Sequence, residues 1–489
     1  MLPSHTVLRS APSPYRKEQD SKDAHTEVDW PPVRDESQDY DLIKLSRNDT
    51  HSILRVWRRW FTCDPYDLEI QNNTVRVIVI YGEDNGFQLS EDHIFKKSIY
   101  FMEILQEIIF PDVMISYDFK LNDFLIPDQD TTYACTFLPM PKLSRKHHII
   151  RYEPIIDPDA ADIVHHILVY GCDSSLHFTS EIGDCYGGDL RYPKCMNSMF
   201  GTAVGGEPFD FPPEMGVSIG TEKDVKYIRL EIHYSNFENK KGILDSSGVR
   251  IFYTPELRPH DSAIIMTGIF TFPIHFIPPG SESYRNYGLC NTHLIPKMLG
   301  EPVGDLTVTS FLLHGHLTVR RMRIMHYRNG KLIGSLGEDL KYDFSFQQCR
   351  NLPETVTVKI GDQIVVECDS STVDREGVTF GGPSTLNEMC IGFLFYYPEL
   401  PIAACWSYQD INQVMEALDQ ERADNIMEAI MNTDSVDWDD ETRKTAQQAA
   451  LKVNHLAMVQ NRAGDNVNET SELPPIFEPI PHPCPEYSP

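Results

Sequence analysis

Short stretches in which apolar and polar residues alternate recur along most of this chain, which is the pattern of half-buried β-strands. Ser52–Trp57 and Thr74–Tyr81 are examples, and both are rich in β-branched or aromatic residues. Gly, Pro and Asp separate the stretches, as turns separate neighbouring strands. The pattern predicts a mainly β protein built from antiparallel β-sandwiches.

The pattern changes after Cys405. Ile411–Leu418 and Arg443–Gln460 carry apolar residues at helical spacing among strong helix formers. Pro474–Pro489 is rich in proline and reads as an extended end. We therefore expect a partly helical tail that packs on the sandwiches.

These changes divide the chain into five predicted parts, and its 489 residues are enough for two or three domains. Residues 1–36 read as a disordered or vestigial leader. The other parts are an incomplete sandwich with a linker at 37–120, sandwich domains at 121–267 and 268–405, and the helical and Pro-rich tail at 406–489.

Composition excludes several classes of function. The formal net charge of −29 argues against nucleic-acid binding, which needs a basic surface. No apolar run reaches the roughly 18 residues that a transmembrane helix needs. Met1–Arg34 lacks the apolar core of a signal peptide.

One candidate metal site combines two histidines with a methionine. His314 and His316 lie at i and i+2 in an apolar strand, so both side chains project from the same face. Met389 lies in a second strand-like stretch, and its soft, neutral thioether suits Cu(I) far better than Zn²⁺ or Mg²⁺. An isolated His-x-His pair would be read as two strand histidines without a metal, so the argument depends on a second histidine cluster.

That cluster comprises the adjacent pair His165 and His166 together with His233. Adjacent residues of a regular strand point to opposite faces, so the pair can share a metal only at a bend, a bulge or a strand end. Three imidazoles would suit copper and zinc equally.

The two histidine sets, in this order, resemble the copper type II, ascorbate-dependent monooxygenases. The resemblance runs from about Thr131 to Cys405, and the wording of two motifs is most similar to the dopamine β-hydroxylase-like branch. The motifs are Asp130–Cys135, Lys146–Pro154, Val204–Phe209, Asp245–Thr254, Phe311–Leu317, Gly381–Thr385 and Asn387–Cys390.

The resemblance implies two nine-stranded, jelly-roll-like domains that face each other across a cleft and hold one copper each. It assigns His165, His166 and His233 to the electron-transfer copper, and His314, His316 and Met389 to the catalytic copper where O₂ binds. It further implies ascorbate as the electron donor, and residues 37–120 resemble the end of a DOMON sandwich.

The family's disulfide frame accounts for ten of the eleven cysteines and leaves Cys349 as a free thiol. The implied pairs are Cys135–Cys185, Cys172–Cys195, Cys290–Cys405, Cys368–Cys390 and Cys63–Cys484. So many disulfides imply an oxidising compartment. The missing signal sequence conflicts with this, and either an incomplete start or a cytosolic product without disulfides would resolve the conflict. Asn48, Asn72 and Asn468 begin glycosylation sequons, which support secretion weakly.

Several further positions carry narrower expectations. Tyr234 and Glu388 adjoin predicted ligands, and simple strand packing is the expected role of both. The pair His147 and His148 is expected to be structural, and His326 to lie at the surface. The family often has a cysteine where Leu294 stands, and it commonly has glycine where Val319 stands, so Val319 would block any conformation with positive φ there.

We expect a secreted or vesicular, copper- and ascorbate-dependent monooxygenase that hydroxylates a small hydrophobic or phenylethylamine-like amine, as in catecholamine metabolism. A homo-oligomer is compatible with this reading. The alternatives are a catalytically silent copper-binding homologue, a peptidylglycine-type hydroxylase and a zinc hydrolase, which Met389 argues against.

Overall fold

A computed structural model of the chain describes residues 5–10, 21–26, 33–48, 52–80, 94–102, 110–172, 180–188, 191, 194–203 and 206–477. The chain divides into two compact units, of which one combines Met1–Met102 with Glu478–Pro489 and the other is Glu103–Phe477. The predicted fold class is confirmed, because strands make up most of the regular structure in both units.

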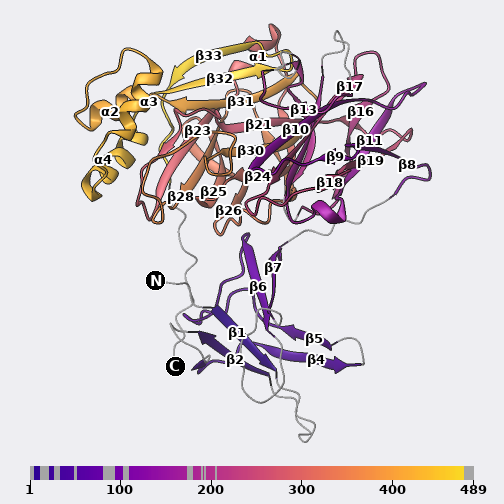
Figure 1. The fold of residues 1–489 in the computed structure, drawn as a ribbon, viewed down its shortest axis with the longest axis vertical. Helices are drawn as coiled ribbons and strands as arrows, with labels where there is room; N and C mark the ends of the chain where they lie inside the picture. The colour runs from indigo at the N-terminus through magenta and orange to yellow at the C-terminus, as the bar shows by residue number, and fades with distance from the viewer. Residues whose placement is uncertain are drawn as a thin grey trace, which may run out of the picture. The chain divides into compact units, whose positions relative to one another are not determined.

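In the described residues of the smaller unit, the strands pair antiparallel (Figure 1). One small sheet has the order β1-β2-β3, and two hairpins pair β4 with β5 and β6 with β7. The bounds are β1 His5–Ser10, β2 Ser21–Thr26, β3 Val33–Arg34, β4 Asp41–Arg47, β5 Ser52–Trp57, β6 Thr74–Ile80 and β7 Ile94–Tyr100.

The larger unit begins with a sandwich whose sheets have the orders β13-β10-β17-β12-β14 and β20-β16-β11-β19-β8, with β15 paired to β11 and β9 to β18. Its strands are β8 Ile115–Lys120, β9 Phe124–Leu125, β10 Thr131–Pro139, β11 His147–Ile155, β12 Val164–Gly171, β13 Gly183–Asp184, β14 Asn197–Ala203, β15 Phe209–Asp210, β16 Met215–Ile219, β17 Tyr227–Ser235, β18 Leu244–Asp245, β19 Gly248–Thr254 and β20 His260–Asp261. A 3₁₀ turn spans Pro158–Ala160.

A second sandwich follows, with sheets ordered β27-β24-β30-β21-β31-β32-β33 and β23-β28-β25-β26, and with β22 paired to β29. Its strands are β21 Ala263–Ile269, β22 Phe276–Ile277, β23 Tyr284–Asn291, β24 Leu306–Gly315, β25 Val319–Arg328, β26 Lys331–Asp339, β27 Arg350–Val358, β28 Gln363–Ser370, β29 Thr379–Phe380, β30 Cys390–Tyr397, β31 Ile402–Gln409, β32 His455–Asn461 and β33 Asn466–Ser471. The helix α1 spans Leu294–Leu299.

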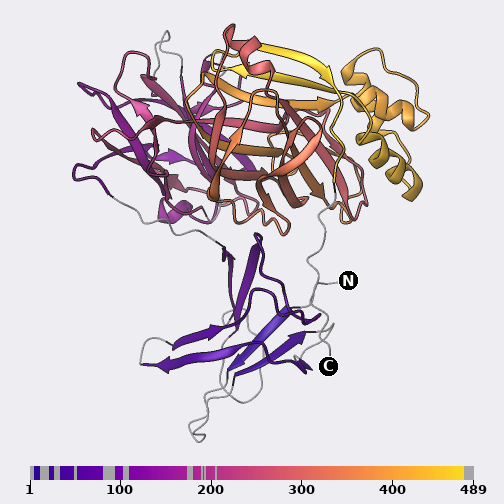
Figure 2. The same cartoon turned by 180° about the vertical axis from the view of Figure 1, so that it is seen from behind.

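The two sandwiches stand side by side in both views (Figures 1 and 2). The apolar core of the first sandwich is continuous with the second, because Ile264 and Phe395 of the second pack into it. A packed apolar interface thus joins the two sandwiches. Leu294 stands where the family that the sequence resembles often has a cysteine. It begins α1 and is buried in the core of the second sandwich.

The expected helical tail is present as α2 Ile411–Ala417, α3 Ile426–Asp434 and α4 Asp440–Ala450, which cover one end of the second sandwich (Figure 1). The helix predicted over Arg443–Gln460 is wrong in its second half, because His455–Asn461 forms strand β32. Burial alternates along β32, which pairs with β31, so the tertiary pairing overrides a sequence rich in helix formers.

Four of the five implied disulfides are confirmed: Cys135–Cys185, Cys172–Cys195, Cys290–Cys405 and Cys368–Cys390. The expected free thiol is also found, since Cys349 forms no disulfide and its Sγ lies 3.0 Å from the hydroxyl of Tyr152. The pairing of Cys63 with Cys484 involves a residue outside the described part of the chain. Within the described residues, no helix is long and apolar enough to cross a membrane.

Candidate metal centre

The first histidine set is held by two neighbouring strands of one sheet. His166 on β12 and His233 on β17 are direct cross-strand partners, so their side chains share a face. The register shifts between Val164 and His166, which makes His165 the extra residue of a bulge. The bulge turns His165 to the face that His166 and His233 share. Without such an irregularity, adjacent residues of a strand would point to opposite faces.

The three imidazoles point at one another. Candidate ligand atoms of His165, His166 and His233 all lie within 4.8 Å of each other, and the three side chains are buried. The Nδ1 atoms of His165 and His166 are 3.1 Å apart. Two nitrogen atoms that bind the same metal ion, each at about 2.0–2.1 Å, lie about this far apart.

Aromatic and acidic side chains enclose this set. The ring of Tyr133 on β10 stacks on His233 with centroids 4.2 Å apart, and its hydroxyl donates to the carbonyl of Pro383 in the second sandwich. Glu231 lies two residues before His233, with its carboxylate 3.9 Å from Nε2 of His166 and 3.2 Å from the guanidinium of Arg229. Burial raises the pKa of Glu231, and Arg229 opposes that shift.

The second set lies where β24 ends and turns towards β25. His314 pairs with Ile391 of β30 and Gly315 pairs with Cys390. Continuing this register by one residue puts Met389 opposite His316, so Met389 shares a face with both histidines. Gly315 is required between them, because a Cβ there would lie 2.7 Å from Cγ2 of Val319 and 3.1 Å from the carbonyl oxygen of Met389.

Each histidine of the second set has a partner for Nδ1. Oε1 of Gln347 lies 2.8 Å from Nδ1 of His314, and the carbonyl oxygen of Asn387 lies 3.3 Å from Nδ1 of His316. Both partners are acceptors, so each Nδ1 carries the proton and donates it, and each Nε2 remains free for a metal. The disulfide Cys368–Cys390 anchors the residue after Met389.

The two sets are in ring contact where the two sandwiches meet. The rings of His166 and His314 meet edge to face with centroids 5.8 Å apart. Phe344 stacks on His165 at 4.5 Å and meets His316 edge-on at 6.3 Å. The packed interface between the sandwiches brings all five imidazoles into one buried cluster.

Burial makes these imidazoles hard to protonate. It lowers the pKa of His314 and of His316 to about 4, and it lowers the pKa of His165 to about 2 with a further contribution from neighbouring imidazoles. The pKa values of His166 and His233 are also lowered by burial and by the other rings. Neutral imidazoles are the form that binds metals, so the cluster is ready to coordinate at neutral pH.

The cluster fits copper on the evidence of its own polar atoms. Nε2 of His165, His166 and His316 and both ring nitrogens of His233 are buried and have no hydrogen-bond partner in the described structure. Buried polar atoms are nearly always partnered, so this concentration indicates a ligand-binding cluster. Imidazoles with a nearby thioether suit copper better than magnesium or calcium.

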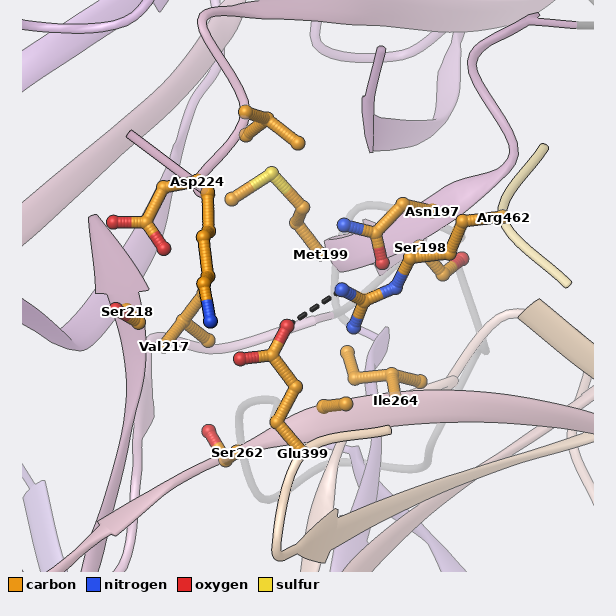
Figure 3. Close-up of a pocket in the computed structure, with 13 residues that line it drawn as sticks. Asn197, Ser198, Met199, Val217, Ser218, Asp224, Ser262, Ile264, Glu399 and Arg462 are labelled. Atoms are coloured by element: carbon orange, nitrogen blue, oxygen red, sulfur yellow. Dashed lines mark hydrogen bonds and ion pairs between the residues drawn. The ribbon is translucent and has the colours of Figure 1, made fainter. Parts of the chain in front are cut away.

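The structure also contains a small cavity, which lies away from the histidine cluster. A space of about 40 Å³ lies between the sandwiches where Glu399 and Arg462 form an ion pair at 2.5 Å (Figure 3). Its lining includes Ser198, Ser218 and Ser262 but none of the five histidines. The cavity is a polar junction, and Met389 is not in its lining either.

Comparison with known proteins agrees with the two sandwiches and their histidines. Residues 117–241 match the N-terminal domain model of the copper type II ascorbate-dependent monooxygenases, and residues 260–418 match the C-terminal domain model. The chain belongs to this family.

Relatives within the monooxygenase family extend over most of the chain. DBH-like monooxygenase protein 2 of Mus musculus is 43% identical over 92% of this chain and 73% of its own length. DBH-like monooxygenase protein 1 of Gallus gallus is 36% identical over 81% of this chain and 66% of its own length. Dopamine beta-hydroxylase of Homo sapiens is 31% identical over 77% of this chain and 61% of its own length.

Some narrower expectations hold and others fail. Tyr234 is packed in the first core, as predicted, and its hydroxyl donates to Asp245 at 2.5 Å. The pair His147 and His148 lies on β11, where Nε2 of His148 is 2.8 Å from Asp261. His326 was expected at the surface, but it is buried because Asp362 pairs with its ring at 2.7 Å.

Two expectations about the second set are also corrected. Val319 is not among the described residues with positive φ, so the replacement of a family glycine imposes no strain there. Glu388 does more than pack in a strand, because its carboxylate accepts hydrogen bonds from the backbone of His316, Thr318 and Met389.

Sequence reasoning missed the side chains that surround the ligands. Gln347 and Phe344 lie in the loop between β26 and β27, and so does Tyr342, whose hydroxyl is 2.9 Å from the amide nitrogen of Gly315 and 2.8 Å from its carbonyl oxygen. This loop has no periodic pattern. Only its high content of polar and aromatic residues hinted at a role.

Proposed function

We propose that this chain is a copper-dependent monooxygenase that uses O₂ and ascorbate to hydroxylate a C–H bond of a small, phenylethylamine-like molecule. The observation that carries the proposal is the convergence of His165, His166 and His233 with His314 and His316 in one buried cluster. Family membership and 31% identity to a dopamine beta-hydroxylase support the reaction class.

In this proposal each set holds one copper, so the chain binds two. Bound copper would supply one-electron redox chemistry at both sets and activation of O₂ at the second. Met389 distinguishes the second set, because a thioether favours the reduced metal. The contact between the rings of His166 and His314 connects the two sets directly.

The surroundings of the cluster suit a reaction that must exclude water. The five imidazoles are at most 8% exposed, and the ring of Phe344 covers His165 and His316. Gln347 and Asn387 hold the second pair of imidazoles with Nε2 free. A substrate must therefore displace packed side chains, among them Phe344, to reach this buried cluster.

Disulfides, sequons and the smaller unit add to this proposal. Four disulfides support folding in the secretory pathway. Asn48, Asn72 and Asn468 are exposed, as glycosylation would require. The hairpins β4–β5 and β6–β7 are the proposed remnant of a DOMON sandwich, and this remnant with the helical tail favours amines over peptides as substrates.

The direct test is ascorbate-dependent hydroxylation of a panel of phenylethylamines by copper-loaded protein from a secretory host. We expect hydroxylated product from wild type and a background rate from Met389→Ala, because the thioether ligand is lost. Met458→Ala is the matched control, since both methionines pack on the same apolar cluster and only Met389 belongs to the proposed ligand set.

A catalytically silent copper-binding homologue is the second candidate. It is favoured by the ring contact between the sets and by Phe344, which together fill the space beside the ligands. Product formation by wild type would exclude it. Two bound coppers without ascorbate-dependent product from any amine in the panel would favour it over the enzyme.

A further inference from the structure

Glu388 is a fully buried carboxylate next to a predicted ligand. Its side chain is 0% exposed, and it directly precedes Met389. Burial of a carboxylate costs much free energy unless charge or hydrogen bonds compensate it. The identity of its partners therefore indicates what the residue is for.

Both carboxylate oxygens of Glu388 accept hydrogen bonds from the segments that carry the second set. Oε1 accepts from the amide of His316 and, at 2.8 Å, from the amide of Met389. Oε2 accepts from the amide of Thr318 at 2.9 Å and from the Thr318 hydroxyl. One oxygen thus joins the backbones of two predicted ligands.

The backbone of Glu388 is itself fixed to the second sandwich. Its amide donates to the carbonyl of Phe380 at 3.0 Å, and its carbonyl accepts from the amide of Gly382 at 3.1 Å. These two hydrogen bonds fix the backbone from which the side chain of Glu388 extends. It holds the turn after β24, with His316, against the segment that leads into β30, with Met389.

The partners of Glu388 differ in kind from those of an ordinary buried carboxylate. Glu367, in the same sandwich, forms a two-point ion pair with Arg323 at 2.8 and 2.9 Å. Glu388 has no such cation within ion-pair distance among the described residues, and backbone amides surround it instead. Its bonds constrain backbone positions, whereas those of Glu367 neutralise one side chain.

We propose that Glu388 is the positioning residue of the second metal site, which sets the relative placement of His316 and Met389. The inference rests on the proposed ligand set of His314, His316 and Met389. The residue touches neither substrate nor metal in this role. Its effect passes through the backbone amides of the two ligands.

The test compares Glu388→Gln with Glu367→Gln in full-length, copper-loaded protein. A carboxamide keeps one acceptor oxygen and turns an NH₂ group towards the amides, so Glu388→Gln loses either the Oε1 bonds to His316 and Met389 or the Oε2 bonds to Thr318. Glu367→Gln also weakens a buried carboxylate's contacts, but away from the histidines. Three readouts are needed: melting temperature, Cu(I) affinity by competition with a chelator, and copper–sulfur scattering in the X-ray absorption of reduced protein.

We expect Glu388→Gln to lower the affinity of one copper by about 10–100-fold and to lose the copper–sulfur scattering, as for other residues that orient ligands. The other copper should bind as in wild type. Glu367→Gln should lower the melting temperature and leave both copper readouts unchanged. Thr318→Val removes one donor, so its effect on affinity should be smaller than that of Glu388→Gln.

Wild-type affinity and sulfur scattering in Glu388→Gln would overturn the inference, whatever the melting temperature. If Glu388→Gln does not fold, Glu388→Asp decides with the same readouts, because the shortened carboxylate reaches fewer of the amides. Absence of sulfur scattering in wild type would instead reject Met389 as a ligand, and with it the proposed ligand set.

Discussion

The two histidine sets are built in different ways. In the first, the sheet alone places the ligands, because His166 and His233 are cross-strand partners and a bulge turns His165 beside them. In the second, the ligands lie at a turn and at the start of a strand. There, Gln347 and Glu388 fix what the sheet does not.

This difference predicts which substitutions should disturb metal binding at each set. Strand pairing holds the first set through many backbone bonds, so the loss of one neighbouring side chain should change it little. The second set depends on single side chains and on one disulfide, Cys368–Cys390. Substitutions around the second set should therefore affect its metal more than comparable substitutions around the first.

The largest expected effect is that of pH on the metal-free protein. Burial lowers the pKa of His314 and of His316 to about 4, while the unfolded chain takes up protons below its ordinary value of about 6.5. The unfolded state binds more protons between these values, so stability is retained above pH 6.5 and falls as pH drops towards 4. The loss approaches roughly 3 kcal/mol for each imidazole.

Urea unfolding at pH 7, 6, 5 and 4 measures this loss. His316→Gln should flatten the dependence, whereas His260→Gln, at an exposed site, should leave it unchanged. A wild-type stability that is constant from pH 7 to pH 4 would contradict the burial of neutral imidazoles. Because the pKa of His165 is lower still, at about 2, the first set should protonate after the second.

Removal of the Cys368–Cys390 disulfide should affect both stability and the second metal. Replacing both cysteines by alanine should cost about 3 kcal/mol, as expected for a loop of this length. Cys172–Cys195 is the matched control, because the bridges span 22 and 23 residues respectively. Calorimetry should show similar losses of stability, whereas copper analysis should show weaker binding at the second site only in the first variant. Equal copper loss in both variants would remove the special role of Cys390 beside Met389.

Gln347→Leu should weaken the second site without unfolding the protein. Nδ1 of His314 would lose its acceptor, and loss of such a partner lowers metal affinity by about 10–100-fold. Cu(I) competition measures the change, with Gln348→Leu as the neighbouring control. An unchanged affinity in Gln347→Leu would show that the sheet alone orients His314, as it does in the first set.

The smallest effect is expected at Tyr133. Tyr133→Phe removes the hydroxyl that donates to Pro383 but keeps the ring that stacks on His233. It should cost about 1 kcal/mol in chemical unfolding and leave copper content unchanged, because strand pairing still holds His233. Loss of copper from the first site would mean that the hydroxyl, and not the sheet, maintains that set.

Sequence predicted what depends on periodicity and on motifs. Flanks rich in Ile, Val, Leu and Tyr identified the strands that carry His166 and His233, and the i, i+2 spacing put His314 and His316 on one face. The need for a bend, a bulge or a strand end at the His165–His166 pair followed from the two-residue period of a strand. Four disulfide pairs came from resemblance to the family and are confirmed.

Sequence did not predict features that depend on contacts between distant segments. The approach of His166 to His314 is set by packing between the sandwiches, and no local pattern records it. Phe344 and Gln347 lie in an aperiodic loop. His455–Asn461 was predicted to be helical from its residues, but it pairs with β31. This pairing determines that the segment forms a strand.

Metal content tests the central claim, that two histidine sets hold one copper each, most directly. The protein would be expressed through a secretory host, loaded with copper and analysed for metal per chain by mass spectrometry. The account predicts two coppers in wild type and a loss of about one in either His233→Ala or His314→Ala, because each variant removes a ligand from a different set. One copper or none in wild type, or an unchanged content in both variants, would contradict it.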